Sequence, residues 1–322
     1  MLIYKATEEN LNLAAEKIIA GDLVAFPTET VYGLGADGLN PIAAAKIFEA
    51  KKRPSFNPLI LHVDSIEQMN GVCETGDAKI NILIENFMPG ALTLVLPKKE
   101  IVPDIVTAGL PTVAVRMPDN RIALELIKRS GTPIAAPSAN SFGFLSPTNA
   151  RHVEKQLGNR IDFILDGGQC KVGVESTILQ IDEKGITLLR PGGVSLEAIE
   201  KLVGKVELKL KNDDNPNSPG QLKHHYSPNI PLIIFKNELP KKINPEKTGA
   251  LFFTKNDYGV NFKAEKILSP NGDLREAAAN LFFHLHELEK ENIDLIISES
   301  VPDYGLGKAI MDRLKRAETE KR

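Results

Sequence analysis

Residues 40–63, NPIAAAKIFEAKKRPSFNPLILHV, decide the fold class because they join a helix to a strand. Asn40 is a candidate N-cap, and Pro41 suits the first position of a helix. The alanine-rich run that follows keeps its helical character until Pro54, which stops it. The apolar run at residues 57–63 then predicts a strand. A helix followed by a strand in this way is typical of an α/β protein.

The sequence on both sides of this stretch keeps the same alternation. Apolar residues recur at helical spacing over residues 11–20, and a short apolar run at 23–26 predicts a strand. Further strands are expected at 92–96 and 112–117. Because few two-residue hairpin signals separate these elements, residues 1–208 are expected to form an α/β domain.

The composition changes over residues 209–229, where Pro, Asn, Gly and Ser crowd together without a sustained apolar period. Such a stretch is typical of a linker or of a long functional loop. Residues 230–322 then carry a second set of α/β signals, which predicts a smaller second domain. Its expected elements are strands at 231–235, 248–254 and 293–298, a long helix after Asp273 and a last helix around 309–316.

The composition excludes several classes of protein. The chain has 322 residues, 42% of them hydrophobic and 25% charged, so wholesale disorder is excluded. A net charge of −3 gives no general basic field, so any anion site must be local. Cys73 and Cys170 form no CxxC motif, which disfavours a disulfide framework or a zinc site. No apolar run approaches the roughly 18 residues of a membrane span, and the first ten residues lack a signal-peptide core. A cytoplasmic protein without a membrane partner is expected.

The first candidate for chemistry is the basic turn at the end of the helix, Lys51, Lys52 and Arg53. Cations often end a helix simply because they interact well with its dipole. Here, however, Arg53 and Asn57 flank a proline-containing turn, and a guanidinium and an ammonium on one rigid turn suit a polyphosphate. His62 lies five residues further on, where a histidine packed in the core is the alternative to a ligand-binding one.

Two strands carry the next candidates. The segment PTETVYGLG at 27–35 follows a strand directly, which places threonine hydroxyls at a sheet edge where α/β proteins bind ligands. It matches neither GxGxxG nor GxxxxGK[ST], and an ordinary turn is an equal alternative. In TVAVRMP at 112–118, strand alternation places Thr112, Ala114 and Arg116 on one face. Burial of Arg116 requires a partner, which is either a structural carboxylate or the carboxylate of a ligand.

Two further segments have the composition of anion-binding loops. APSANSFGFLSPT at 136–148 gathers neutral hydroxyl and amide donors, which can hold a phosphate without a cation, although any polar loop has a similar composition. In VGVESTILQ and LLRPGGVS, Arg190 precedes Gly192 and Gly193, which permit close backbone approach or form a strand-to-helix turn. His284 and His286 lack the spacing of HExxH, so no metal site is predicted.

Six of these segments occur in a fixed order within residues 5–208: PTETVYGLG, KKRPSFNPLILHV, TVAVRMP, APSAN, VESTI and LLRPG. In this order they closely resemble the YrdC-type threonylcarbamoyl-AMP synthases. SPGQLKHHYSP at 218–228 and the α/β unit after it resemble the two-domain form of that family. The resemblance implies a YrdC-like twisted mixed sheet flanked by helices, then residues 209–229 as a linker and active-site lid, then a smaller Rossmann-like α/β domain at 230–322.

The resemblance also implies an activity. L-threonine and bicarbonate would form a carbamate that attacks ATP, giving threonylcarbamoyl-AMP, pyrophosphate and water. Mg²⁺ would accompany ATP without dedicated protein ligands. A partner transferase complex would carry the product to tRNA, which the chain itself is a candidate to contact. The alternatives are a module that binds double-stranded RNA or tRNA without ATP turnover, and a carbamoyl-transfer domain of hydrogenase maturation, for which the chain lacks the length and cysteines.

Site residues follow from the same resemblance. Lys52 and Arg53 would be catalytic, with Lys51 assisting. The expected L-threonine-binding residues are Thr30, His62, Arg116 and Ala136. The expected ATP-binding residues are Arg53, Asn57, Thr112, Ser138, Asn140, Ser146, Arg190 and Tyr226, the last closing over the site as the linker folds back.

Overall fold

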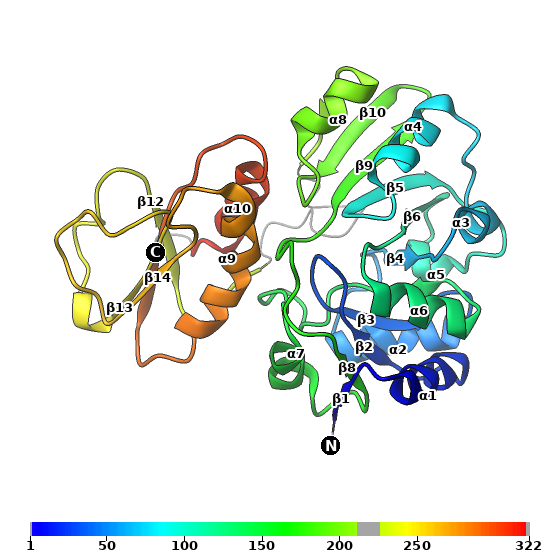
Figure 1. The fold of residues 1–322 in the computed structure, drawn as a ribbon, viewed down its shortest axis with the longest axis horizontal. Helices are drawn as coiled ribbons and strands as arrows, with labels where there is room; N and C mark the ends of the chain where they lie inside the picture. The colour runs from blue at the N-terminus through cyan, green and yellow to red at the C-terminus, as the bar shows by residue number, and fades with distance from the viewer. Residues whose placement is uncertain (1, 211–225, 320–322) are drawn as a thin grey trace.

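A computed structural model describes residues 2–210 and 226–319, which form two α/β domains (Figure 1). The first nineteen elements in the chain belong to the larger domain and the remainder to the smaller one. The expected fold class, a large mixed sheet with helices followed by a smaller α/β domain, is confirmed. Most of the expected linker, residues 211–225, lies outside the described residues, so its expected structure stays a prediction.

The larger domain is built on one mixed sheet of eleven strands in the order β1-β8-β2-β3-β7-β4-β6-β5-β9-β10-β11. The strands are β1 (Ile3–Lys5), β2 (Val24–Phe26), β3 (Gly33–Asp37), β4 (Ile60–His62), β5 (Leu92–Pro97), β6 (Thr112–Arg116), β7 (Ile134–Ala135), β8 (Ile164–Asp166), β9 (Thr177–Asp182), β10 (Gly185–Arg190) and β11 (Glu207–Leu208). The helices are α1 (Glu8–Ile19), α2 (Pro41–Lys51), α3 (Ile66–Val72), α4 (Ala78–Phe87), α5 (Asp104–Thr107), α6 (Arg121–Ser130), α7 (Ala150–Leu157) and α8 (Leu196–Val203).

The stretch at 40–63 shows how local signals set these boundaries. Asn40 caps α2 as expected, since its side chain accepts hydrogen bonds from the backbone N–H groups of Ile42 and Ala43. Lys52 ends the helix in the left-handed region, with φ of 53°. The strand expected at 57–63 is shorter, because β4 begins only at Ile60. The residues before it form a turn around the Arg53 side chain instead of pairing in the sheet.

Strand pairing brings distant candidates together. β4 and β6 are parallel neighbours, and His62 lies opposite Arg116 in their register. Both residues end their strands, so both lie at the same edge of the sheet. β7 pairs antiparallel with β4 on its other side, with Ala135 opposite Leu61, so the loop at 136–148 leaves β7 beside Ile60, at the start of the short strand β4. The sheet therefore positions three of the candidate segments around one point.

The smaller domain is a sheet of four parallel strands in the order β12-β15-β13-β14. Its elements are β12 (Leu232–Phe235), η1 (Pro245–Lys247), β13 (Thr248–Phe252), β14 (Ala264–Ile267), α9 (Leu274–Leu288), β15 (Leu295–Glu299) and α10 (Gly307–Ala317). The elements expected from sequence are all present, and β14 is additional. Figure 1 shows α9 and α10 on the side of this sheet that faces the larger domain.

The two domains share part of their hydrophobic core. Val31, Leu145 and Val174 of the larger domain belong to one buried cluster with residues of α9 and α10. The backbone also approaches closely, since a Cβ atom added at Gly173 would lie 2.4 Å from the Cα of Ala279. The second domain is thus packed against the loops that surround the sheet edge. None of the helices in the described ranges has the length and apolarity required to cross a bilayer.

Candidate active site

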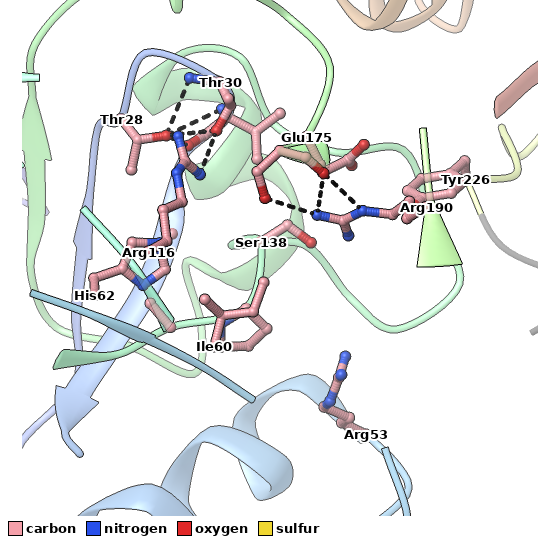
Figure 2. A pocket seen from close by; sticks show the side chains of 15 residues that line it. Thr28, Thr30, Arg53, Ile60, His62, Arg116, Ser138, Glu175, Arg190 and Tyr226 are labelled. Carbon is pink, nitrogen blue, oxygen red and sulfur yellow. Dashed lines mark hydrogen bonds between the residues drawn. The ribbon is translucent and has the colours of Figure 1, made fainter. Parts of the chain in front are cut away.

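A hollow extends along β4, and its lining includes Ile60 and His62 of that strand and Arg116 at the end of β6 (Figure 2). Segments far apart in the chain meet in its wall, and Tyr226 comes from the last part of the expected linker. Eight of the residues expected from the family resemblance line it: Thr30, Arg53, His62, Arg116, Ala136, Ser138, Arg190 and Tyr226.

One end of the hollow is organised around Arg116, which is only 4% exposed. Its Nη2 donates to Oε1 of Glu29 over 2.6 Å, its Nη1 to the Thr30 hydroxyl over 2.9 Å, and its Nε to the carbonyl of Gly90. The Glu29 carboxylate is the structural partner that the sequence left open. A guanidinium has five N–H donors, so two remain for a ligand carboxylate while all three of these bonds persist.

His62 lies beside Arg116 at the same end (Figure 2). Burial, together with the positive charge of Arg116, lowers the pKa of its imidazole to about 3. The ring is therefore neutral at physiological pH. Its Nδ1 has no hydrogen-bond partner among the described residues. A neutral ring nitrogen at this place is able to accept a hydrogen bond from an amino group or to donate one, according to its tautomer.

The other end of the hollow contains Arg53. Its Nε and Nη2 donate to the carbonyl and side-chain oxygens of Asn57, over 3.0 and 2.6 Å, and Nη2 also reaches the carbonyl of Pro58. These bonds fix the guanidinium plane and leave the two N–H groups of Nη1 for the hollow, into which the side chain points in Figure 2. Burial lowers the pKa of Arg53 to about 9, and the charge of Arg190 contributes to the lowering. An anionic ligand would offset both effects.

Arg190 stands near Arg53 in the wall and is anchored to Ser176. Its Nε and Nη2 donate to the Ser176 carbonyl over 3.1 and 2.9 Å, and Nη2 also donates to the Ser176 hydroxyl. The close backbone approach expected at Gly192 is present. A Cβ atom there would lie 2.3 Å from the carbonyl oxygen of Glu175, so a larger residue would displace the segment that holds Arg190.

The Lys51 side chain stabilises the loop at 136–148 by hydrogen bonds. Its ammonium donates to the backbone carbonyls of Ser138 and Asn140, and its side chain is 1% exposed. Burial lowers the pKa of this ammonium well below its usual range. The group is thus used inside the protein and does not line the hollow with Arg53, contrary to the expectation that Lys51 assists at the phosphates.

Five expected residues lie outside the wall of the hollow. Asn57 is buried and orients Arg53, while Asn140 accepts a 2.5 Å hydrogen bond from Ser138. Thr112 begins β6, at the opposite end from Arg116. The remaining two are Lys52, which is exposed and lines a separate hollow with Lys51 and Arg160, and Ser146, which is buried and bonded to Glu175. Their proposed roles remain predictions.

Sequence reasoning missed three charged residues. Glu29 and Glu175 lie inside motifs that were quoted, PTET and VEST, so the motifs marked their positions but not their partners. Arg313 of α10 pairs with Glu175 over 2.7 Å, and nothing in the sequence of the last helix distinguishes it from its basic neighbours. The ring centroid of His286 lies 3.9 Å from that of His152. Within residues 2–210 and 226–319 no group of three His, Cys, Asp or Glu side chains could hold a metal ion.

Comparison with known proteins agrees with this geometry. The model of the family of Sua5, YciO and YrdC, described as telomere recombination, matches residues 16–192, and the model described as the threonylcarbamoyl-AMP synthase C-terminal domain matches residues 194–318. The chain belongs to the threonylcarbamoyl-AMP synthase family. Relatives of that name are 43% identical in Pyrococcus abyssi, over 96% of this chain and 94% of the relative, and 44% identical in Bacillus subtilis, over 94% and 91%.

Solved structures extend the likeness to the fold of the synthase family. A crystal structure of Sua5 from P. abyssi in complex with L-threonine superposes with a TM-score of 0.90 at 40% identity. The match covers 98% of this chain and 97% of the other. The two-domain form of the synthase family is therefore the form of this chain, as expected from the resemblance. The domain limits at residues 208 and 230 stay a prediction.

Proposed function

We propose that this chain is an L-threonylcarbamoyladenylate synthase, which converts L-threonine, bicarbonate and ATP into threonylcarbamoyl-AMP, pyrophosphate and water. The observation that carries the proposal is a single hollow with two different ends. Arg116, already paired with Glu29, offers two donors at one end, while Arg53 and Arg190 concentrate positive charge at the other. Membership of the synthase family supports the same conclusion.

The first end suits an amino acid. The fork of Arg116 would receive the threonine carboxylate, and Thr30 would keep that fork in place. His62, neutral at physiological pH, would contact the amino group or the substrate hydroxyl without adding charge. Ala136, buried in the wall, would contact the threonine side chain and leave room for it.

The second end suits a polyphosphate. Threonine nitrogen and bicarbonate would form a carbamate with loss of water, and a carbamate oxygen would attack the α-phosphorus of ATP. The bond to the β-phosphate oxygen breaks, and pyrophosphate leaves with the electron pair. Arg53 and Arg190 would stabilise the charge that develops on the phosphates, and no side chain needs to form a covalent intermediate. Mg²⁺ is proposed as part of the MgATP substrate, held by phosphate oxygens.

The downstream steps are further parts of the proposal. The product would pass in the cytoplasm to a threonylcarbamoyl transferase complex, which acts on the adenosine beside the anticodon of tRNAs. Direct contact of this chain with tRNA stays a prediction.

The test is to incubate the full chain with MgATP, L-threonine and isotopically labelled bicarbonate, and to detect labelled threonylcarbamoyl-AMP by mass spectrometry, with L-serine as the competing amino acid. We expect pyrophosphate release to require threonine. Pyrophosphate release that is unaffected by omitting threonine would contradict the proposal. RNA binding with a steep salt dependence and no ATP turnover would favour the alternative module.

A further inference from the structure

Arg313 of the smaller domain reaches the active-site wall of the larger one. It lies in α10, and its side chain is 1% exposed. Its Nε donates to Oε2 of Glu175 over 2.7 Å, and its Nη1 donates to Asp312 over 2.7 Å. Glu175 lines the hollow, so a single hydrogen bond separates α10 from the site.

Glu175 connects Arg313 to two segments that contribute residues to the wall, the loop at 136–148 and the segment that holds Arg190. Its other oxygen, Oε1, accepts a hydrogen bond from Ser146 in the loop at 136–148. Burial by itself would raise the pKa of Glu175, but the charges of Arg313 and Arg190 and the Ser146 hydroxyl lower it to about 2. The carboxylate is therefore ionised at physiological pH. The next residue, Ser176, holds Arg190 through its carbonyl and hydroxyl groups.

Tyr226 is the second residue that Arg313 contacts. The guanidinium carbon lies 4.9 Å from the centre of the Tyr226 ring, within the range of a cation–π interaction. Tyr226 lines the hollow and is 1% exposed, with its backbone in the left-handed region at φ of 65°. Its ring also packs 5.7 Å from that of Phe282 in α9. The smaller domain thus holds Tyr226, the first described residue after position 210, against the nucleotide end of the site.

A contribution to stability alone does not account for this arrangement. Burying an ion pair costs desolvation free energy, and well-packed apolar replacements are often equally stable. In the part of the chain that the structure describes, Nη2 of Arg313 is buried without a hydrogen-bond partner, which adds to the cost. Because burying the Arg313 charge is costly and the side chain bonds Glu175 in the wall of the hollow, a role in orienting the residues of the site explains it better.

We propose that Arg313 is a positioning residue for the ATP end of the site, acting through Glu175 and Tyr226 on Ser146 and Arg190. The inference rests on the proposed function, because it assigns the end that Arg313 supports to ATP. It gives the smaller domain a role in the reaction without a contact to substrate. The threonine end, held within the larger domain by Glu29, is independent of Arg313.

The experiment measures steady-state pyrophosphate release by the full chain as ATP and threonine are varied separately. For Arg313→Met we expect the KM for ATP to rise roughly 10- to 50-fold and kcat to fall several-fold, with the KM for threonine within about 2-fold of the wild type. Arg313→Lys should recover part of the loss, since it keeps the charge but not the planar fork. Arg316→Met is the matched control, because Arg316 is also buried in α10 but bonds Asp312 and the carbonyl of Leu210. The control should stay within about 3-fold of the wild type.

A double-mutant cycle keeps the test decisive if Arg313→Met does not fold. Glu175→Gln combined with Arg313→Met removes both charges, so no unpaired carboxylate is left buried. We expect the double variant to fold and to show about the same rise in KM for ATP as Glu175→Gln alone. A wild-type KM for ATP in Arg313→Met, or in the double variant, would overturn the inference. Equal losses toward both substrates, explained by a smaller active fraction, would also overturn it. Failure of the wild type to make threonylcarbamoyl-AMP would instead refute the proposed function.

Discussion

The two ends of the active-site hollow differ in how their cations are compensated. Arg116 is paired with the buried carboxylate of Glu29 and a threonine hydroxyl, so its charge is balanced before any ligand binds. Arg53 is bonded to neutral oxygens of Asn57 and Pro58 and keeps two donors for the hollow. A balanced end suits a zwitterion such as an amino acid, whereas an end where Arg53 has only neutral partners suits a polyanion. The two subsites therefore differ mainly in whether an arginine is bonded to a carboxylate or to neutral oxygens, and less in how many arginines they contain.

The largest expected effect is at the end of the hollow that contains Arg53. Arg53→Ala should lower kcat/KM for ATP by roughly 100- to 1,000-fold, because it removes fixed donors from the developing phosphate charge. Threonine binding, measured by isothermal titration calorimetry without ATP, should change less than about 3-fold, since Arg116 and Glu29 stay paired. A parallel loss of threonine affinity would show that the two ends are not separate.

Arg116→Lys should have the next largest effect, at the balanced end. A lysine keeps the charge beside Glu29 but loses the planar fork, so the KM for threonine should rise about 100-fold while the KM for ATP stays within about 3-fold. Steady-state pyrophosphate release checks both constants. Because Arg116→Ala would leave the Glu29 carboxylate buried and unpaired, the matched removal is Glu29→Gln with Arg116→Met. Unchanged threonine kinetics in Arg116→Lys would contradict the assignment of this end.

The neutral histidine at the balanced end predicts a pH dependence of stability. The pKa of His62 is lowered to about 3 in the fold, whereas the unfolded value is near 6.5, so the unfolded chain binds the extra proton as the pH falls below about 6.5. This contribution to stability is present above the unfolded pKa and is lost toward pH 3. In His62→Gln, the slope of unfolding free energy against pH, from denaturant titrations between pH 4.5 and 6, should be smaller by about 1.4 kcal/mol per pH unit.

A second buried histidine provides a comparison for this slope of unfolding free energy against pH. His152, whose pKa is lowered to about 2 chiefly by burial, contributes in the same direction and serves as the comparison through His152→Gln. Both variants should flatten the slope by similar amounts. A slope that is unchanged in His62→Gln would mean that this imidazole is charged in the folded protein, and the end would not be balanced.

Lys52→Ala should have the smallest effect. Its side chain is exposed and lines a separate hollow, so kcat/KM for ATP should fall less than about 3-fold, far less than for Arg53→Ala. Steady-state pyrophosphate release measures this change in kcat/KM. A loss as large as that of Arg53→Ala would restore the catalytic role expected from the family resemblance. It would also show that Lys52 moves toward the phosphates when ATP binds.

The sequence was sufficient for the fold class because its signals are local. The Asn40 cap, the Pro41 start and the apolar run before His62 each act within a few residues, and the structure confirms them. β4 is shorter than expected because Arg53 donates hydrogen bonds to carbonyl groups of the turn that precedes it, a contact between residues that periodicity does not describe.

Partners of buried charges could not be found in this way. The sequence shows that a buried Arg116 needs a partner, but the partners, Thr30 and Glu29 of the PTET motif, lie 86 and 87 positions away in the chain. Glu175 and Arg313 are 138 positions apart and lie in different domains. Pairings of that kind depend on how the domains pack, and a single sequence contains no local signal for them.

The hydrophobic cluster that joins Val31, Leu145 and Val174 to α9 and α10 affects how the protein unfolds. Unfolding of either domain would expose the apolar surface of the other to solvent. A state with only one domain folded is therefore unfavourable. We therefore expect a single calorimetric transition instead of two. A nick in the connecting segment should leave the halves associated, and the protein would then behave as a heterodimer made from one gene.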